Sequence, residues 1–114
     1  MSEIVRRCEE LHPETCQRFR EIQIEDYKIF CSKQLDYGPT NITGGEDINN
    51  EDGNNKALYG VAVRINDKVS RLKNLLWPKV GKSKINNESI EDSLMDLSNY
   101  GIIARLVKEK TWSK

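Results

Sequence analysis

Charged side chains recur at three- and four-residue spacing in two stretches of helical character. The first set is Arg64, Asp67, Lys68 and Arg71, and the second is Glu88, Asp92, Asp96 and Asn99. Because such steps return to the same side of a helix, each set shares one face. Carboxylates beside cations are the arrangement that holds phosphoryl or pyrophosphoryl groups during chemistry.

Asp96 is the most informative of these carboxylates. It lies well past the first turn of its helix and interrupts an apolar run, so it needs a partner. Mg²⁺ is a suitable partner because it takes oxygen ligands from carboxylates, phosphate and water. If the two faces oppose each other, we expect Asp67 and Asp96 to hold Mg²⁺, while Arg64, Lys68 and Arg71 neutralise phosphate oxygens.

Both sets also have a purely structural interpretation. The first can be a solvated face tied by ion pairs within the helix. In the second, Glu88 and Asp92 can complement the positive end of the helix dipole, and Asp96 and Asn99 can form a buried hydrogen-bond network. Spacing alone leaves these alternatives open.

A further group of candidates lies at residues 33–41. Gly38 is suited to end a helix in a left-handed conformation, with Tyr37 packed over it. The functional alternative places Lys33 and Asp36 at the mouth of a bundle, with Tyr37 available to stack on a base.

The apolar pattern predicts an all-α fold, a small bundle of three to four principal helices. We expect helices over 2–11, 13–34 and 56–76 and a last one from about 87, separated by a long loop at 35–55 and a basic loop at 78–86. Ser2 is the expected cap of the first helix, and the pair Trp77-Pro78 is expected to end the third.

Composition restricts the partners. A chain of 114 residues is the size of one domain, and 37% hydrophobic against 32% charged residues predicts a thin core that another copy completes, hence a homo-oligomer. Lys plus Arg (18) balances Asp plus Glu (18), so we expect no direct DNA binding and no attraction to membranes.

We also expect a cytoplasmic protein, because the sequence has neither a run of about 20 apolar residues nor an apolar leader near its start. The three cysteines, Cys8, Cys16 and Cys31, follow no metal-ligand spacing and are interpreted as reduced packing residues.

Three blocks, taken together, resemble the small phage-associated family called nucleotide modification associated domain 1, and more distantly the MazG-like all-α nucleoside triphosphate pyrophosphohydrolases. The blocks are Lys33-x-x-Asp36-Tyr37-Gly38, Arg64-x-x-Asp67-Lys68-x-x-Arg71-Leu72 and Glu88-Ser89-x-x-Asp92-x-x-x-Asp96-Leu97-x-Asn99-Tyr100. They occur in the right order over about the last two-thirds of the chain. If the protein is phage-encoded, we expect it in the cytoplasm of the host cell.

The MazG-like resemblance implies a helical bundle that dimerises or tetramerises, binds Mg²⁺ through an ExxE and an ExxD pair, and cleaves a (deoxy)nucleoside triphosphate to monophosphate and pyrophosphate. Asp96 followed by Tyr100 fits the end of the ExxD helix. Ser93, however, stands at the Glu position of ExxD, which leaves Asp92 as a substitute. Arg64-x-x-Asp67 stands where ExxE is expected.

The preferred hypothesis is therefore a Mg²⁺-dependent nucleotide pyrophosphohydrolase, or a related phage protein of nucleotide metabolism. Its expected metal ligands are Asp67, Asp92 and Asp96, with Asp67 and Asp96 also catalytic; its phosphate-binding residues are Lys33, Arg64, Lys68 and Arg71; its base or sugar contacts are Asp36, Tyr37 and Asn99. The missing glutamates favour an alternative, a non-catalytic nucleotide binder such as a nucleotide-signal sponge or an accessory subunit. A structural helical adaptor is a third hypothesis.

Overall fold

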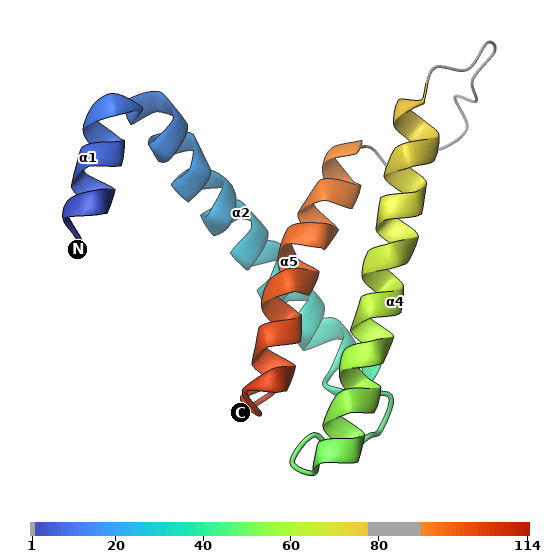
Figure 1. Ribbon diagram of the computed structural model, residues 1–114. Helices are drawn as coiled ribbons and strands as arrows, with labels where there is room; N and C mark the ends of the chain where they lie inside the picture. The colour runs from blue at the N-terminus through green and yellow to red at the C-terminus, as the bar shows by residue number, and fades with distance from the viewer. Residues whose placement is uncertain (1, 78–89) are drawn as a thin grey trace.

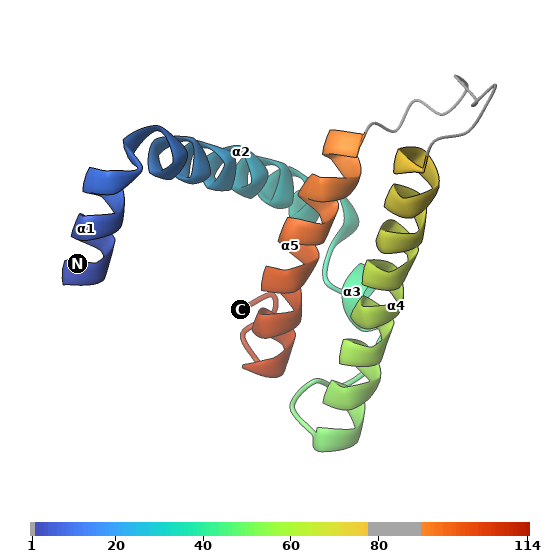
Figure 2. The same cartoon turned by 45° about the horizontal axis from the view of Figure 1, so that its top comes forward.

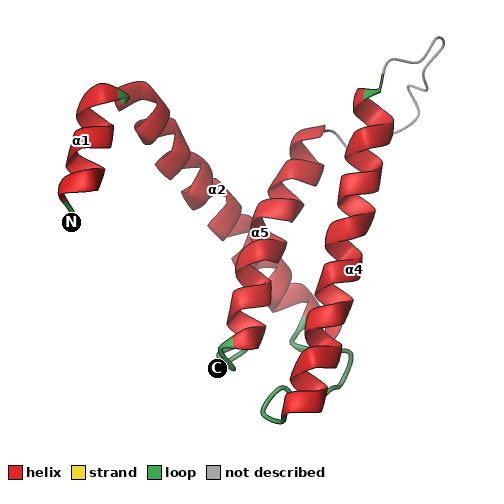
Figure 3. Cartoon of the chain, in the orientation of Figure 1, coloured by secondary structure: helices red, strands yellow, loops and turns green. Residues whose placement is uncertain are grey.

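The computed structural model describes residues 2–77 and 90–114, and every regular element in these ranges is a helix (Figure 3). The helices are α1 (Glu3–Leu11), α2 (Pro13–Tyr37), α3 (Thr40–Thr43), α4 (Glu51–Leu76) and α5 (Ile90–Lys108). The predicted all-α class is confirmed for this part of the chain. The basic loop at 78–86, the expected helix start near 87 and Glu88 lie outside the described residues.

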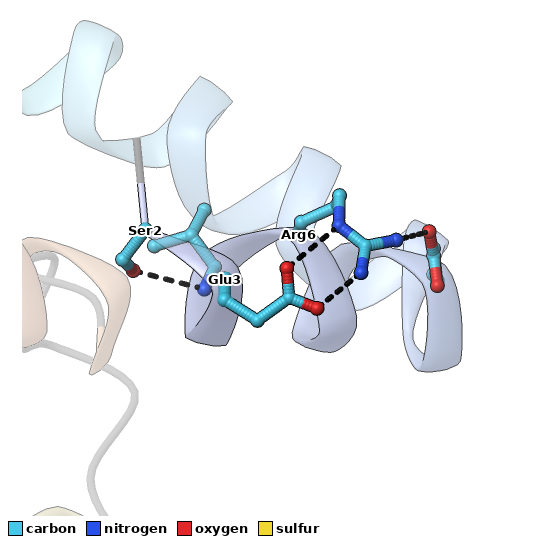
Figure 4. Close-up of polar contacts among 5 residues, drawn as sticks. Ser2, Glu3 and Arg6 are labelled. Carbon is cyan, nitrogen blue, oxygen red and sulfur yellow. Dashed lines mark hydrogen bonds and ion pairs between the residues drawn. The ribbon is translucent and has the colours of Figure 1, made fainter.

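Helix α1 begins where the sequence predicts. The hydroxyl of Ser2 accepts a hydrogen bond from the backbone N–H of Val5 at 3.2 Å, which satisfies a donor of the first turn. Arg6 bonds to Glu3 and Glu10 along one side of the helix (Figure 4). These pairs are exposed, so they contribute little to stability.

Helix α2 ends three residues later than predicted, at Tyr37. Gly38 has φ of +73°, a conformation that favours glycine, and its N–H bonds to the carbonyl of Gln34 at 3.1 Å. The predicted role of Gly38 as a helix stop is confirmed. Three of the apolar residues of α2, Phe19, Ile22 and Tyr27, are exposed. Phe30, nearer the end of the helix, packs against the core.

The predicted loop at 35–55 is shorter than expected. Helix α3 lies within it, and α4 starts at Glu51 instead of residue 56 because Asn50 caps it, accepting a hydrogen bond from the N–H of Gly53 at 2.7 Å. The buried side chain of Asn54 then donates to the carbonyls of Ile48 and Val107, both at 2.8 Å. These bonds outweigh the low helix propensity of the asparagine-rich segment.

Helices α4 and α5 lie side by side and form the main body, with α3 against α4 and the end of α2 against α5 (Figures 1 and 2). The core lies at the end of this body where α4 begins and α5 ends. Its buried hydrophobic residues are Ile42, Ile48, Ala57, Val61, Ile103, Val107 and Trp112. The thin core predicted from composition is confirmed by this short set.

The start of the chain projects from the body as an arm, defined as residues 3–25 (Figure 1). Its large apolar residues are exposed: Ile4, Leu11, Phe19, Ile22 and Ile24. The radius of gyration is consequently 17.2 Å, whereas a compact chain of this length has a value of about 13 Å. Among the described helices, none has both the length and the apolar character needed to cross a membrane.

Candidate functional site

A cavity of about 430 Å³ opens where α2, α3, α4 and α5 converge. This volume is in the range of about 300–1,000 Å³ that small-molecule pockets occupy. Its polar lining comes from Lys33, Gln34, Asn41, Arg64, Lys68, Asp96 and Asn99. The cavity therefore brings together five of the residues predicted from sequence to form the site, Lys33, Arg64, Lys68, Asp96 and Asn99, and Tyr37 joins them at its edge.

Asp96 lies between two lysines from different helices. Its two oxygens are 3.1 Å from the Nζ of Lys33 and 2.8 Å from the Nζ of Lys68. The Asp96 side chain is only 12% exposed. The expectation that Asp96 needs a partner is met by these two ammonium groups.

The lysines determine the protonation state of Asp96. Burial raises the pKa of its carboxyl, but hydrogen bonds and charge from Lys68 and Lys33 outweigh burial and hold that pKa below the ordinary value. Asp96 is therefore ionised at neutral pH. With Arg64 as a third cation, the lining carries three positive charges and one negative, a surplus of two positive charges.

Arg64 is fixed in the cavity wall by the short helix α3. Its Nη2 donates to the carbonyl of Asn41 at 2.6 Å. This bond occupies one donor of a guanidinium group that has five, which orients the group. Helix α3 therefore positions a cation as well as contributing Ile42 to the core.

The aromatic side of the cavity consists of Phe30, Tyr37, Tyr100 and Trp112. Phe30 and Trp112 meet edge to face with ring centroids 6.2 Å apart. The indole Nε1 of Trp112 donates to the carbonyl of Pro39 at 3.1 Å. These rings provide apolar faces on which a planar base can stack, close to the cations.

Trp112 was not predicted from the sequence, and Gln34 and Asn41, although inside the candidate segment 33–41, had no predicted role. Ser113, beside Trp112, accepts a hydrogen bond from the side-chain amide of Gln34 at 2.9 Å, so the tail after α5 is held against α2. A tryptophan in an otherwise polar tail is the one signal of this role in the sequence.

Asn99 has a structural role that the sequence left open. Its side-chain amide is buried and donates to the backbone carbonyl of Asp26 at 3.0 Å, which joins α5 to α2. The hydrogen-bond network interpretation is therefore confirmed for Asn99, and the same residue also lines the cavity.

The remaining predicted residues lie elsewhere. Asp67 and Arg71 line a separate surface hollow on α4, Asp92 lines another between α2 and α5, and Asp36 is exposed on the last turn of α2. Of these two faces, the residues that line one cavity together are Arg64 and Lys68 of α4 and Asp96 and Asn99 of α5.

The metal prediction requires carboxylates to converge. Within residues 2–77 and 90–114, no group of three or more His, Cys, Asp or Glu side chains is placed to hold a metal ion. Ser93, at the Glu position of the ExxD pattern, is fully buried and packs inside the structure. The cavity offers Mg²⁺ one carboxylate, Asp96, and both lysines contact it.

Comparisons with known proteins give no relative: no protein-family model matches the chain, and searches of curated proteins and solved structures find no similar one.

Proposed function

We propose that this protein binds a phosphorylated nucleotide in the cavity between α2, α4 and α5, without needing to hydrolyse it. The observation that carries the proposal is the meeting of Lys33 and Lys68 on Asp96 inside a hollow that also holds Arg64. Cations grouped in a partly enclosed site bind phosphate oxygens more strongly than cations in open water, because the local dielectric constant is lower.

The aromatic lining supports a nucleotide over a simple phosphate. Tyr37 is largely exposed at the edge of the cavity, and Tyr100 and Trp112 lie on its inner wall. A base stacked on such a ring gains about 1–3 kcal/mol. The ligand class that satisfies both sides of the cavity has a planar ring and a phosphate, as a nucleotide does.

Asp96 acts in this proposal as an internal counterion. In the free protein it compensates the charges of the lysines, and a phosphate group then competes with it for the same ammonium groups. Binding therefore exchanges one anion for another, which favours ligands with two or more negative charges over those with one.

Mg²⁺-dependent hydrolysis, as the MazG-like resemblance implies, is the second candidate. Asp96 supports it, since it is a carboxylate inside the same cavity as the phosphate-binding cations. Against it stands the separation of Asp67 and Asp92 from Asp96 among three different hollows. The resemblance itself stays a prediction, as does Mg²⁺ as cofactor.

The proposal is tested by measuring the melting temperature with a panel of nucleoside mono-, di- and triphosphates and cyclic dinucleotides. Each is measured once with Mg²⁺ and once with a chelator. We expect a rise in melting temperature that persists in the chelator, with the nucleotide recovered intact by chromatography. Lys68→Ala should abolish the rise, while Lys73→Ala, on the same helix but outside the cavity, should retain it.

The outcomes separate the candidates. Release of monophosphate and pyrophosphate over many turnovers, dependent on Mg²⁺, would replace the binder with the hydrolase. If no nucleotide changes the melting temperature under any condition, both the binder and the hydrolase are overturned and the structural adaptor remains.

We further propose that the protein is a homo-oligomer and that the arm is where two copies meet. The arm exposes Phe19, Ile22 and Ile24, whose side chains are 62%, 42% and 57% exposed. Because the formal net charge of the chain is zero, two copies do not repel each other strongly. A cytoplasmic location, where nucleotides are abundant, belongs to the same proposal.

A further inference from the structure

Two cysteines face each other across the bend between α1 and α2. The Sγ atoms of Cys8 and Cys16 are 3.6 Å apart, in contact as a hydrogen-bonded thiol pair. All three cysteines are free thiols, and Cys31 lies four turns further along α2. The close approach is therefore particular to one pair.

The backbone of the bend holds this pair in place. The N–H of His12 donates to the carbonyl of Cys8 at 2.8 Å, and the N–H of Cys16 donates to the carbonyl of His12 at 3.0 Å. Pro13 fixes the backbone in the first turn of α2. Both cysteine backbones are thus bonded to the same residue, which keeps the two sulfurs on the same side of the bend.

The geometry points to Cys8 and Cys16 as a redox-sensitive pair that forms a disulfide and clips α1 onto α2. A disulfide bond is about 2.05 Å long, so the sulfurs must approach by about 1.5 Å. The arm lies away from the body (Figure 2), so this approach does not require the core to move.

The oxidant in this proposal is hydrogen peroxide. Cys8 is exposed and reacts first: its sulfur attacks one peroxide oxygen, the O–O bond breaks, and water leaves as Cys8 becomes a sulfenic acid. The sulfur of Cys16 then attacks the Sγ of Cys8; the S–S bond forms, the S–O bond breaks, and the hydroxide leaves as water with the proton of Cys16. Two thiols are oxidised to one disulfide, and one peroxide is reduced to two waters.

The electrostatics of the pair fit this division of roles. The hydrogen bond with Cys8, followed by burial, raises the pKa of the Cys16 thiol above its ordinary value. A thiol with a raised pKa is less often ionised, so Cys16 reacts with peroxide more slowly than an ordinary cysteine does. Cytoplasmic disulfides are usually transient and redox-sensing, which is the use proposed here.

The position of the pair separates this inference from the nucleotide proposal. Neither cysteine lines the cavity. The disulfide instead fixes the orientation of α1 relative to α2, within the arm that we propose as the contact between copies. Disulfide formation and nucleotide binding can therefore each fail without the other.

The test uses the full chain, first fully reduced and then treated with hydrogen peroxide, with intact mass and free thiols measured. We expect the loss of two hydrogens and one remaining free thiol, at a rate independent of protein concentration. Trypsin leaves both cysteines in the single peptide 8–18, and a second cleavage after Glu9, Glu10 and Glu14 separates them. The fragments 8–9 and 15–18 should then stay joined until a reductant is added.

Cys31→Ser is the matched control, and it should form the same bond and leave no free thiol. Cys8→Ser and Cys16→Ser should each keep two free thiols under the same treatment, with circular dichroism establishing that they fold. A cross-link that maps to Cys31 or joins two chains would overturn the inference, as would Cys8 oxidised to sulfinic acid with no disulfide formed.

Discussion

The buried amide of Asn54 donates to the carbonyl of Val107 at 2.8 Å, which ties the first turn of α4 to the last turn of α5. Asn54→Ala removes this bond and the buried bond to the carbonyl of Ile48, so we expect a loss of about 2 kcal/mol in the free energy of unfolding. Urea unfolding followed by circular dichroism measures it. Asn55→Ala, one residue along and exposed, should change stability by less than about 0.5 kcal/mol. Equal losses of stability in the two variants would contradict a stabilising contact between α4 and α5 at Asn54.

Gly53 and Gly60 lie on the same helix in opposite environments. A Cβ atom on Gly53 would meet the backbone oxygen of Asp47 at 2.1 Å, whereas one on Gly60 would meet nothing within 4 Å. We expect Gly53→Ala to destabilise by about 1–3 kcal/mol, since backbone must move. Gly60→Ala should stabilise by about 0.5–1 kcal/mol through helix propensity. Thermal melts compare the pair, and a stable Gly53→Ala protein would refute the close approach.

Asp96→Asn separates the internal-counterion role from metal binding. The amide keeps the shape of the side chain but gives up its charge, which frees Lys33 and Lys68 for phosphate. We therefore expect nucleotide affinity to rise by about tenfold, corresponding to about 1.4 kcal/mol. Isothermal titration calorimetry in a chelator measures this change. Weaker binding in Asp96→Asn would instead favour Asp96 as a ligand-binding or metal-binding carboxylate.

The lowered pKa of Asp96 also makes stability depend on pH. A carboxyl whose pKa is lower in the folded state stabilises that state above its unfolded pKa, here 3.8, and loses the effect as pH falls through the folded value. We expect Asp96→Asn to be less stable than the parent by about 1 kcal/mol near pH 7. The two proteins should converge below about pH 4, as urea unfolding at several pH values would detect. If the difference in unfolding free energy between the two proteins persists in acid, ionisation of Asp96 is excluded as its cause.

Phe19 tests the arm as the contact between copies. Its side chain is 62% exposed on α2. We expect light scattering after size-exclusion chromatography to give a multiple of the 13.2 kDa chain mass for the parent protein. Phe19→Glu should lower it to one chain by burying a charge at the contact. Leu35→Glu, on the same helix and 88% exposed but outside the arm, is the control and should leave the mass unchanged. A monomeric parent would rule out the oligomer.

The helices themselves were predictable because local signals determine most of their ends. Ser2 caps α1, Pro13 starts α2 and Gly38 ends it, each for a reason that the residue type carries. The start of α4 was missed because an Asn- and Gly-rich run is typical of turns. Its helix depends on bonds from Asn54 to residues on both sides, which only the tertiary structure reveals.

The kinds of residue in the site could be predicted from the sequence better than their arrangement in space. Helical spacing placed Arg64 with Lys68 and Asp96 with Asn99, and these four do meet. The same spacing put Asp67 and Asp92 on those faces, yet each faces a different hollow. Periodicity gives the face of one helix, but the positions where two helices face each other depend on how they pack. The lysine from α2 that completes the Asp96 pair could not be assigned by spacing at all.

The tail after α5 gives this protein a built-in optical probe. Of its two tryptophans, Trp112 is 5% exposed in the wall of the cavity, and Trp77 is 70% exposed at the other end of α4. An indole in such a dry setting emits at shorter wavelength than one in water, and a base stacked against it quenches that emission. The tryptophan fluorescence of a Trp77→Phe protein, excited selectively over tyrosine, therefore comes from Trp112 in the cavity wall, and occupancy can be followed in solution without any label.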